Sequence, residues 1–143
     1  MENNNNYKFW LGGFVEGEGS LTISIVKYDK ATHGFLLQPE FNIAQHINGL
    51  DILKSFKILF NNKGQIHKKA GSINVWVYTL KGINNLNDYL IPFFDKYSLQ
   101  GQKRLDYIDF KKVSEIVSRK EHLNEKGYNE ILRIKKGMNL KRI

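Results

Sequence analysis

The chain has 143 residues, of which 41% are hydrophobic, and this predicts a single domain, 1–143, with its own core. The absence of cysteine excludes disulfides and thiolate metal sites, and no apolar run is long enough to predict a membrane span. The formal net charge of +8 indicates a polyanionic partner or simply a basic surface.

A glycine-rich helix is predicted at 7–19, after a polar segment at 1–6 that we expect to be a disordered tail. Gly13 and Gly17 are four residues apart, so on a helix they share a face that a second helix can approach closely. Each glycine costs a helix about 1 kcal/mol relative to alanine. These glycines therefore need a packing reason, and contact with an identical helix is the simplest one.

Two carboxylates, Glu16 and Glu18, stand at the end of this helix. Because they are two residues apart, they point in different directions and cannot both serve one site. Gly19 is expected to end the helix in a left-handed turn, which leaves Glu18 at the negative end of the helix dipole, where a divalent cation is favoured. Two other interpretations are a nucleotide-binding G-x-G loop, for which the element order is wrong, and a structural helix with solvated acids.

Alternating strands are predicted at 20–28 and 35–44, on either side of a turn. Their inward positions are Leu21, Ile23, Ile25, Leu37, Pro39, Phe41 and Ile43. A helix at 51–60, a hairpin with strands at 64–69 and 74–80, and a helix at 84–94 follow, and further helices are predicted at 102–118 and 125–136. The core order is therefore αββαββα, an α+β fold with an antiparallel sheet, followed by a helical tail at 119–143.

The stretch WLGGFVEGEGS resembles the signature of the LAGLIDADG homing endonucleases, whose nine motif positions fall on Leu11 to Gly19. Gly12 stands where the family often has alanine, and Glu16 and Glu18 stand where aspartate is common. The element order resembles the family fold, in which the sheet forms a DNA-binding saddle. The segments YSLQGQKRLDYIDFKKV and HLNEKGYNEILRIKKGMN are similar to the C-terminal regions of fungal mitochondrial members.

No second motif follows Ser20, and a family member with one motif acts as a homodimer. The resemblance thus implies a site-specific, metal-dependent endonuclease that cuts long, nearly palindromic double-stranded DNA. A composition typical of an AT-rich genome adds the expectation of a soluble mitochondrial intron product, without a membrane partner or a small-molecule cofactor. The expected dimer interface comprises Leu11, Gly12, Gly13, Glu16 and Gly17.

The resemblance makes Glu18 the carboxylate ligand of a metal ion, joined by the backbone carbonyl of Gly17. Mg²⁺ is the expected cofactor, with Mn²⁺ as a substitute and Ca²⁺ supporting binding without turnover. By family position, Gln45 is expected to orient solvent, and Lys103 to stabilise developing charge or to perturb the attacking water. By residue type alone, Gln45 and Lys103 are ordinary surface residues.

The outward strand faces form the candidate DNA surface, because they mix the donors, acceptors and apolar groups that read base edges in the major groove. A merely solvated sheet would show the same pattern. His67 and Lys69 are expected to hold phosphates, whereas Trp76 contacts either bases or the core. The candidates are Thr22, Ser24, Val26, Tyr28, Gln38, Glu40, Asn42, His67, Lys69, Asn74 and Trp76.

The alternative function is a non-cleaving nucleic-acid binder on the same fold, either an intron RNA maturase or a regulator. Glu18, Gln45 and Lys103 together favour the enzyme, because a binder has no need of the acid.

Overall fold

The elements follow the predicted α+β order, and the computed structural model describes residues 4–139. In chain order they are α1 (Asn5–Glu18), β1 (Gly19–Lys27), β2 (Phe35–His46), η1 (Ile47–Gly49), α2 (Leu50–Leu59), β3 (Gln65–Lys68), β4 (Val75–Lys81), a continuous helical stretch of α3 (Ile83–Asn85), η2 (Leu86–Leu90) and α4 (Ile91–Lys96), then α5 (Lys103–Ser118), η3 (Glu121–Leu123) and α6 (Glu125–Lys136). The order αββαββα with two further helices is confirmed.

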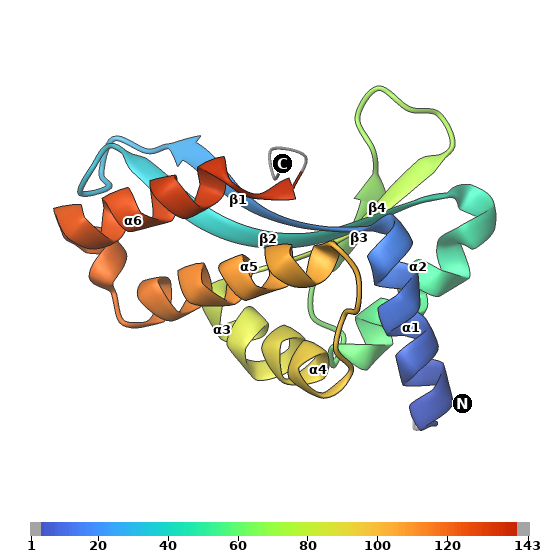
Figure 1. Ribbon diagram of the computed structural model, residues 1–143. Helices are drawn as coiled ribbons and strands as arrows, with labels where there is room; N and C mark the ends of the chain where they lie inside the picture. Colours follow the sequence, from blue (N-terminus) through green and yellow to red (C-terminus); the bar gives the residue numbers. More distant parts are fainter. Residues whose placement is uncertain (1–3, 140–143) are drawn as a thin grey trace.

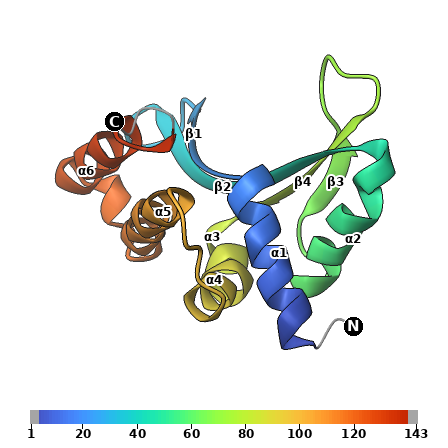
Figure 2. The same ribbon diagram turned by 45° about the vertical axis from the view of Figure 1, so that its right-hand side comes forward.

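The four strands form one antiparallel sheet in the order β1-β2-β4-β3, so β1 and β3 are its edges. Figures 1 and 2 show α1 to α5 on one side of this curved sheet, whereas no described helix covers the other side, the open face, between the β1–β2 and β3–β4 hairpins. The predicted inward residues of β2, and Leu21 and Ile23 of β1, are buried against these helices. The prediction that Ile25 points inward is wrong, since Ile25 is 41% exposed near the free end of the edge strand β1.

An aromatic cluster fixes the sheet on its helices. Phe41, fully buried in the middle of β2, packs with ring centroids 5.8 to 6.4 Å from Phe56 and Phe60 of α2 or its end, Tyr78 of β4 and Phe94 of α4. Deleting a buried phenylalanine typically costs about 3–5 kcal/mol, so this cluster makes the helix side of the sheet a rigid base for the open face.

Two expectations about α1 are corrected. The helix begins at Asn5, before the predicted start, because the Asn4 side chain accepts a hydrogen bond from the Asn6 amide at 2.8 Å and caps it. The expected tail therefore reduces to residues 1–3, which lie outside the described residues. Gly19 is extended (φ −83°, ψ 164°), not left-handed. Glycine fits there because a Cβ atom would lie 2.7 Å from Val15 Cγ1.

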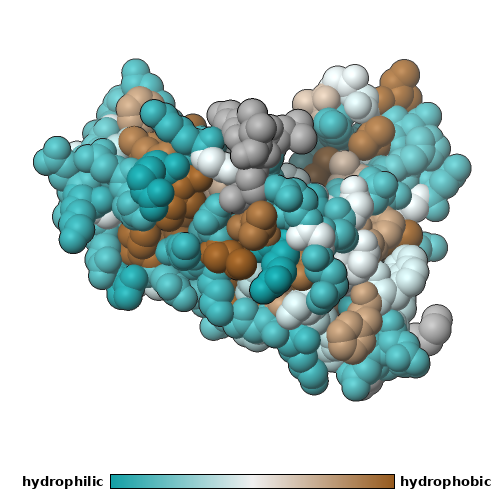
Figure 3. Space-filling model, viewed as in Figure 1, coloured by the Kyte–Doolittle hydropathy of each residue, from teal (hydrophilic) through white to brown (hydrophobic). Residues whose placement is uncertain are grey.

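The surface in Figure 3 is mostly hydrophilic, with hydrophobic areas beside α6 and at the tip of the β3–β4 loop. Ile73 in that loop is 86% exposed. Within residues 4–139, no helix combines the length and the apolar character needed to cross a bilayer.

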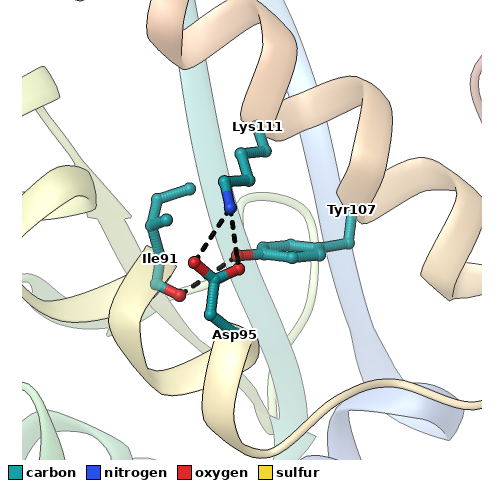
Figure 4. Close-up of polar contacts among 4 residues, drawn as sticks. All are labelled: Ile91, Asp95, Tyr107 and Lys111. Atoms are coloured by element: carbon teal, nitrogen blue, oxygen red, sulfur yellow. Dashed lines mark hydrogen bonds and ion pairs between the residues drawn. The ribbon is translucent and has the colours of Figure 1, made fainter.

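A polar cluster joins α4 to α5 (Figure 4). The Tyr107 hydroxyl lies 2.8 Å from Asp95 Oδ1 and 3.1 Å from the Ile91 carbonyl oxygen, and Lys111 Nζ lies 2.9 Å from Asp95 Oδ2. Desolvation by burial raises the pKa of Asp95, but the hydrogen bonds from Lys111 and Tyr107 and the charge of Lys111 outweigh it. The net result is a pKa below the ordinary value of 3.8.

We expect Asp95→Asn to lower the free energy of unfolding at neutral pH by about 1 kcal/mol, a modest value because the ion pair is partly exposed. Since folding lowers this pKa, the contribution is complete above the unfolded value and is lost as the pH falls through the folded value. Urea unfolding at about pH 6 and about pH 3 should therefore show a larger acid loss in the wild type than in the variant. The same acid loss in both proteins would contradict this role of Asp95.

Candidate nucleic-acid interface and metal site

The open face of the sheet presents rows of side chains that run across the strands. One row joins Thr22, Glu40 and Lys81, and the next joins Ser20, Asn42, Thr79 and Gln65. Within the second row the Thr79 hydroxyl lies 2.6 Å from Asn42 Oδ1. Further candidates lie in flanking rows, with Ser24 opposite Gln38, Val26 opposite Leu36, and Val77 opposite Ala44 and His67. The face therefore carries donors, acceptors and methyl groups at strand spacing.

The strand register places the candidate DNA-binding residues of the second hairpin on two different faces of the sheet. His67 lies on the open face, opposite Val77, and Lys69 is exposed just beyond β3. Trp76 shares the helix side of β4 with the fully buried Tyr78, so it belongs to the covered face and not to the candidate DNA surface. Its ring lies 5.8 Å from Lys68 Nζ.

Two candidates lie outside the strands. Tyr28 is 45% exposed in the turn after β1, where its amide bonds to the Gly34 carbonyl at 2.9 Å. Asn74 is exposed before β4, and its carbonyl accepts a hydrogen bond from Ile47 at 2.7 Å. Both flank the open face instead of forming its centre.

Sequence reasoning missed four open-face residues of the second hairpin: Gln65, Val77, Thr79 and Lys81. The segment VWVYTLK has apolar or aromatic residues on both faces of the strand, so its sequence does not show which face is buried. The polar pair at 79 and 81 was the available signal, because polar side chains at alternate positions mark the solvent side of a strand.

Three hydrogen bonds tie the end of α1 to the start of α5 and the residues just before it. The Glu16 carboxylate lies 3.3 Å from the backbone amides of both Gln100 and Lys103, where the positive end of the α5 dipole favours a negative charge. Lys103 Nζ in turn donates to the Gly19 carbonyl at 2.6 Å. Glu16 thus has a structural role within the chain. It helps to hold Lys103, whose ammonium bonds to Gly19, the residue that follows Glu18 in the sequence.

Glu18 is exposed, and its carboxylate has no partner among residues 4–139. It follows Gly17 in the last turn of α1, where backbone carbonyls lack partners within the helix. Gln45 lies on β2 two residues after Ile43, which pairs with Gly19 at the start of β1. Gln45 is half-buried on the helix side of β2, opposite Trp76.

The residues at this end of α1 fit part of a divalent-metal site. A carboxylate and a backbone carbonyl are the hard oxygen ligands that Mg²⁺ and Ca²⁺ prefer. One chain supplies too few of them, because no group of three or more His, Asp or Glu among the described residues is placed to hold a metal ion. Glu18 and Gly17 therefore suit a site completed by oxygens from outside the chain.

The expected interface residues separate into two sets. Leu11 is 1% exposed in the chain's own core, and Gly12 is buried with its α-carbon position facing the Tyr97 carbonyl, where a Cβ would lie at 3.6 Å. By contrast, Gly13 and Gly17 are exposed, and a Cβ at either would meet nothing within 4 Å. Only the second pair forms a free glycine face, and nothing within the described chain explains why glycine is used there.

The match to known proteins agrees with this fold. The family model described as LAGLIDADG endonuclease matches residues 11–114, so the chain belongs to the LAGLIDADG endonuclease family. It is 34% identical over 129 residues to the probable intron-encoded endonuclease 2 of Neurospora crassa, covering 90% of this chain. It is 34% identical over 131 residues, or 89% of this chain, to the DNA endonuclease I-CeuI of Chlamydomonas moewusii.

Solved structures match along nearly the whole chain. The I-LtrWI LAGLIDADG homing endonuclease bound to target DNA superposes with a TM-score of 0.90 at 36% identity over 100% of this chain. The meganuclease I-SmaMI bound to uncleaveable DNA gives a TM-score of 0.91 at 34% identity over 98% of this chain, and I-SmaMI was also solved with uncleaved DNA in the presence of calcium ions.

The matched region is only part of each of these proteins. The chain spans 26% of the Neurospora relative and 60% of I-CeuI. It spans 47% of the solved I-LtrWI chain and 46% of the I-SmaMI chain. This domain therefore corresponds to about half of each solved, DNA-bound chain.

Proposed function

We propose that this domain is a site-specific, metal-dependent endonuclease for double-stranded DNA. The observation that carries the proposal is the end of α1, where the exposed Glu18 carboxylate has no partner among the described residues and the Lys103 ammonium bonds to the carbonyl of the next residue, Gly19. A protein that only binds nucleic acid has no use for an exposed, unpaired acid beside its binding face, because the acid repels phosphates.

The substrate follows from the open face. Its mixed polar and apolar rows suit base edges in a major groove, which is wide enough for a β-ribbon, and the net charge of +8 suits phosphates. DNA in the solved relatives I-LtrWI and I-SmaMI supports the same substrate class. We assign phosphate contacts to His67 and Lys69. We assign base contacts to Thr22, Ser24, Val26, Gln38, Glu40, Asn42, Gln65, Val77, Thr79 and Lys81, with Tyr28 and Asn74 at the margins.

Glu18 and the Gly17 carbonyl would hold a divalent ion, Mg²⁺ in the working enzyme, with Mn²⁺ as a substitute and Ca²⁺ supporting binding alone. When bound, such an ion polarises a phosphate and lowers the pKa of a water molecule. The Lys103 ammonium, fixed by the Gly19 carbonyl, adds positive charge where negative charge develops on the phosphate. Gln45 orients solvent from the neighbouring strand.

A second domain completes the enzyme in this proposal. One carboxylate cannot cut two strands, and the free face of Gly13 and Gly17 lets another α1 helix approach closely. A second copy of the chain would supply both the helix and the acid, in the place of the remaining half of the longer solved chains. The homodimer would then read a long, nearly palindromic duplex, because the two identical saddles are related by a two-fold axis.

The gene is assigned to an organellar intron, with a mitochondrial product. The names of the Neurospora crassa relatives describe intron-encoded endonucleases. The lysine-, asparagine- and isoleucine-rich sequence is typical of an AT-rich genome.

Two substitutions, one beside the open face and one on it, should weaken DNA binding in different ways. Lys69→Ala removes a phosphate contact, so affinity should fall on every duplex and the salt slope should flatten by about one unit. Asn42→Ala removes a base-reading group, so the loss of about 1–3 kcal/mol should be confined to particular base pairs. Titration of cognate and random duplexes over a range of salt concentrations measures both. Equal losses on cognate and random DNA for both variants would show that the sheet does not read sequence.

The function is tested by separating binding from cutting. Duplexes that bind tightly in Ca²⁺ are selected from a random pool, and Mg²⁺ then replaces Ca²⁺ in the isolated complexes. We expect one defined cut in each strand after the exchange. Tight, sequence-specific complexes that stay uncut in Mg²⁺ and Mn²⁺ would replace this function by that of a regulator or maturase.

A further inference from the structure

The free edge of β1 carries an ordered row of occupied carbonyls. Within residues 4–139, β1 pairs only with β2, so one edge of β1 has no neighbouring strand in this part of the chain. On that edge the carbonyls of Gly19, Leu21 and Ile23, at alternate positions, each accept a side-chain hydrogen bond. Alternate carbonyls on one edge are the acceptors that a further strand would use.

The three donors come from the C-terminal part of the chain. Lys103 Nζ reaches Gly19 at 2.6 Å, Asn139 Nδ2 reaches Leu21 at 3.1 Å and Lys135 Nζ reaches Ile23 at 2.6 Å. The donors and acceptors are 84, 118 and 112 residues apart, respectively. Figure 1 shows the C-terminal end of α6 beside β1. The C-terminal region thus takes the place of a missing strand.

These donors are held firmly in place. All three side chains are half-buried, and Asn139 has a left-handed backbone (φ 59°). The Asn139 amide donates to Asp106 Oδ1 at 2.8 Å, and Asp106 is only 5% exposed in α5. An ordinary surface lysine or asparagine would keep its polar group in water. Here the donors give up part of their exposure for the backbone of β1.

We propose that Lys135 and Asn139 are positioning residues for DNA recognition, which hold β1 in place together with Lys103. Unpaired edge strands fray and vary in twist. The side chains of Ser20, Thr22 and Ser24 alternate with the clamped carbonyls and lie on the open face. A hydrogen-bonded edge therefore fixes the positions from which β1 contacts base pairs. The hydrogen bonds from Lys103, Lys135 and Asn139 to the β1 carbonyls are called the clamp below. The role of the clamp in DNA recognition rests on the proposed function, whereas the existence of the clamp does not.

The test uses Lys135→Met, which keeps the apolar stem and removes the donor, and Lys135→Arg, which restores a donor. Lys136→Met is the matched control, since it removes one positive charge from an exposed neighbour on the same helix. Asn139→Asp is a second variant that keeps the backbone amide to Asp106 and removes the Nδ2 donor. Each full-length protein is compared with the wild type by amide hydrogen exchange and by binding to duplexes substituted one base pair at a time.

In the exchange arm, the amides of Thr22 and Ser24, which face β2, should exchange roughly fivefold to tenfold faster in Lys135→Met and Asn139→Asp. Lys135→Arg should restore protection, and Lys136→Met should leave it unchanged. Unchanged exchange in both donor-less variants would overturn the clamp.

In the binding arm, preference should fall about tenfold at the base pairs that contact β1 and should stay unchanged at those that contact β4. Affinity for random DNA should fall equally in Lys135→Met and Lys136→Met, because each loses one charge. Faster exchange with an unaltered preference profile would overturn the role in recognition. If the wild type shows no sequence preference, the proposed function is wrong. The amide hydrogen exchange of Thr22 and Ser24 would still show whether the clamp stabilises β1.

Discussion

Glu18→Gln is expected to abolish cleavage while DNA binding survives. The amide keeps the shape of the side chain but loses the negative charge, so a divalent ion would lose the one carboxylate that we propose as its ligand among residues 4–139. Loss of about 4 kcal/mol of transition-state stabilisation corresponds to a roughly thousandfold slower cut. Binding to the cognate duplex should be equal or tighter, because each subunit then carries one less negative charge toward the phosphates. Single-turnover cleavage and gel-shift titration on one duplex measure the two effects separately.

Glu16→Gln is the matched control for this substitution. Its carboxylate accepts from the amides of Gln100 and Lys103, so the variant should lose about 1 kcal/mol of folding stability. Metal-dependent cutting should remain at temperatures where the variant is folded. Full cutting by Glu18→Gln, or equal loss of cutting in the two variants, would remove the assignment of Glu18 as the metal ligand.

Gly13→Leu is expected to block assembly without harming the monomer. Within the chain a Cβ at Gly13 meets nothing within 4 Å, and leucine is the better helix former by roughly 1 kcal/mol. Across a two-fold axis the added side chain appears twice, and overpacking of about 1–3 kcal/mol per side should weaken the dimer by about 2–6 kcal/mol. Sedimentation over a concentration series measures the change, and thermal unfolding reports the monomer.

Gly13→Ala gives a graded comparison, since it adds one methyl group at the same position. We expect a smaller weakening of the dimer by alanine and a monomer at least as stable as the wild type. A wild-type chain that sediments as a monomer at micromolar concentration, with and without DNA, would contradict the homodimer and assign the second domain to another chain or segment.

Much of the fold follows from local patterns in the sequence. The helix predicted at 125–136 coincides with α6, and the apolar alternation of 35–44 identifies the core side of β2. The pattern ends at Ile43, yet β2 continues to His46, because pairing with β4 persists beyond the last buried side chain. Periodicity marks where a strand is buried, and the partner strand decides where it stops.

The second hairpin shows where such patterns fail. β4 carries apolar or aromatic groups at both parities, and its facing is decided by packing, since the Tyr78 hydroxyl reaches the Lys63 carbonyl at 2.8 Å and so can be buried. This contact turns Trp76 toward the helices and places Thr79 on the open face. A sequence contains no spacing rule for a hydrogen bond of this kind.

The candidate site shows the same division. The motif identified Glu18 as a candidate ligand. It also suggested Leu11 and Gly12 for a dimer interface, but both pack within the chain's own core. The contact of Lys103 with Gly19 joins residues 84 positions apart, so no local pattern could predict it. Residue types suggested which side chains could take part in chemistry, and the tertiary fold determined which of them are exposed.

Cleavage of the intron-less form of the host locus tests the central claim most directly. The purified wild-type protein is incubated with that duplex and Mg²⁺, and both strands are sequenced at their new ends. We predict a double-strand break at one position, absent without a divalent ion and absent with Glu18→Gln. An intact duplex in Mg²⁺ and Mn²⁺, under conditions where the protein binds it tightly and specifically, would contradict the account.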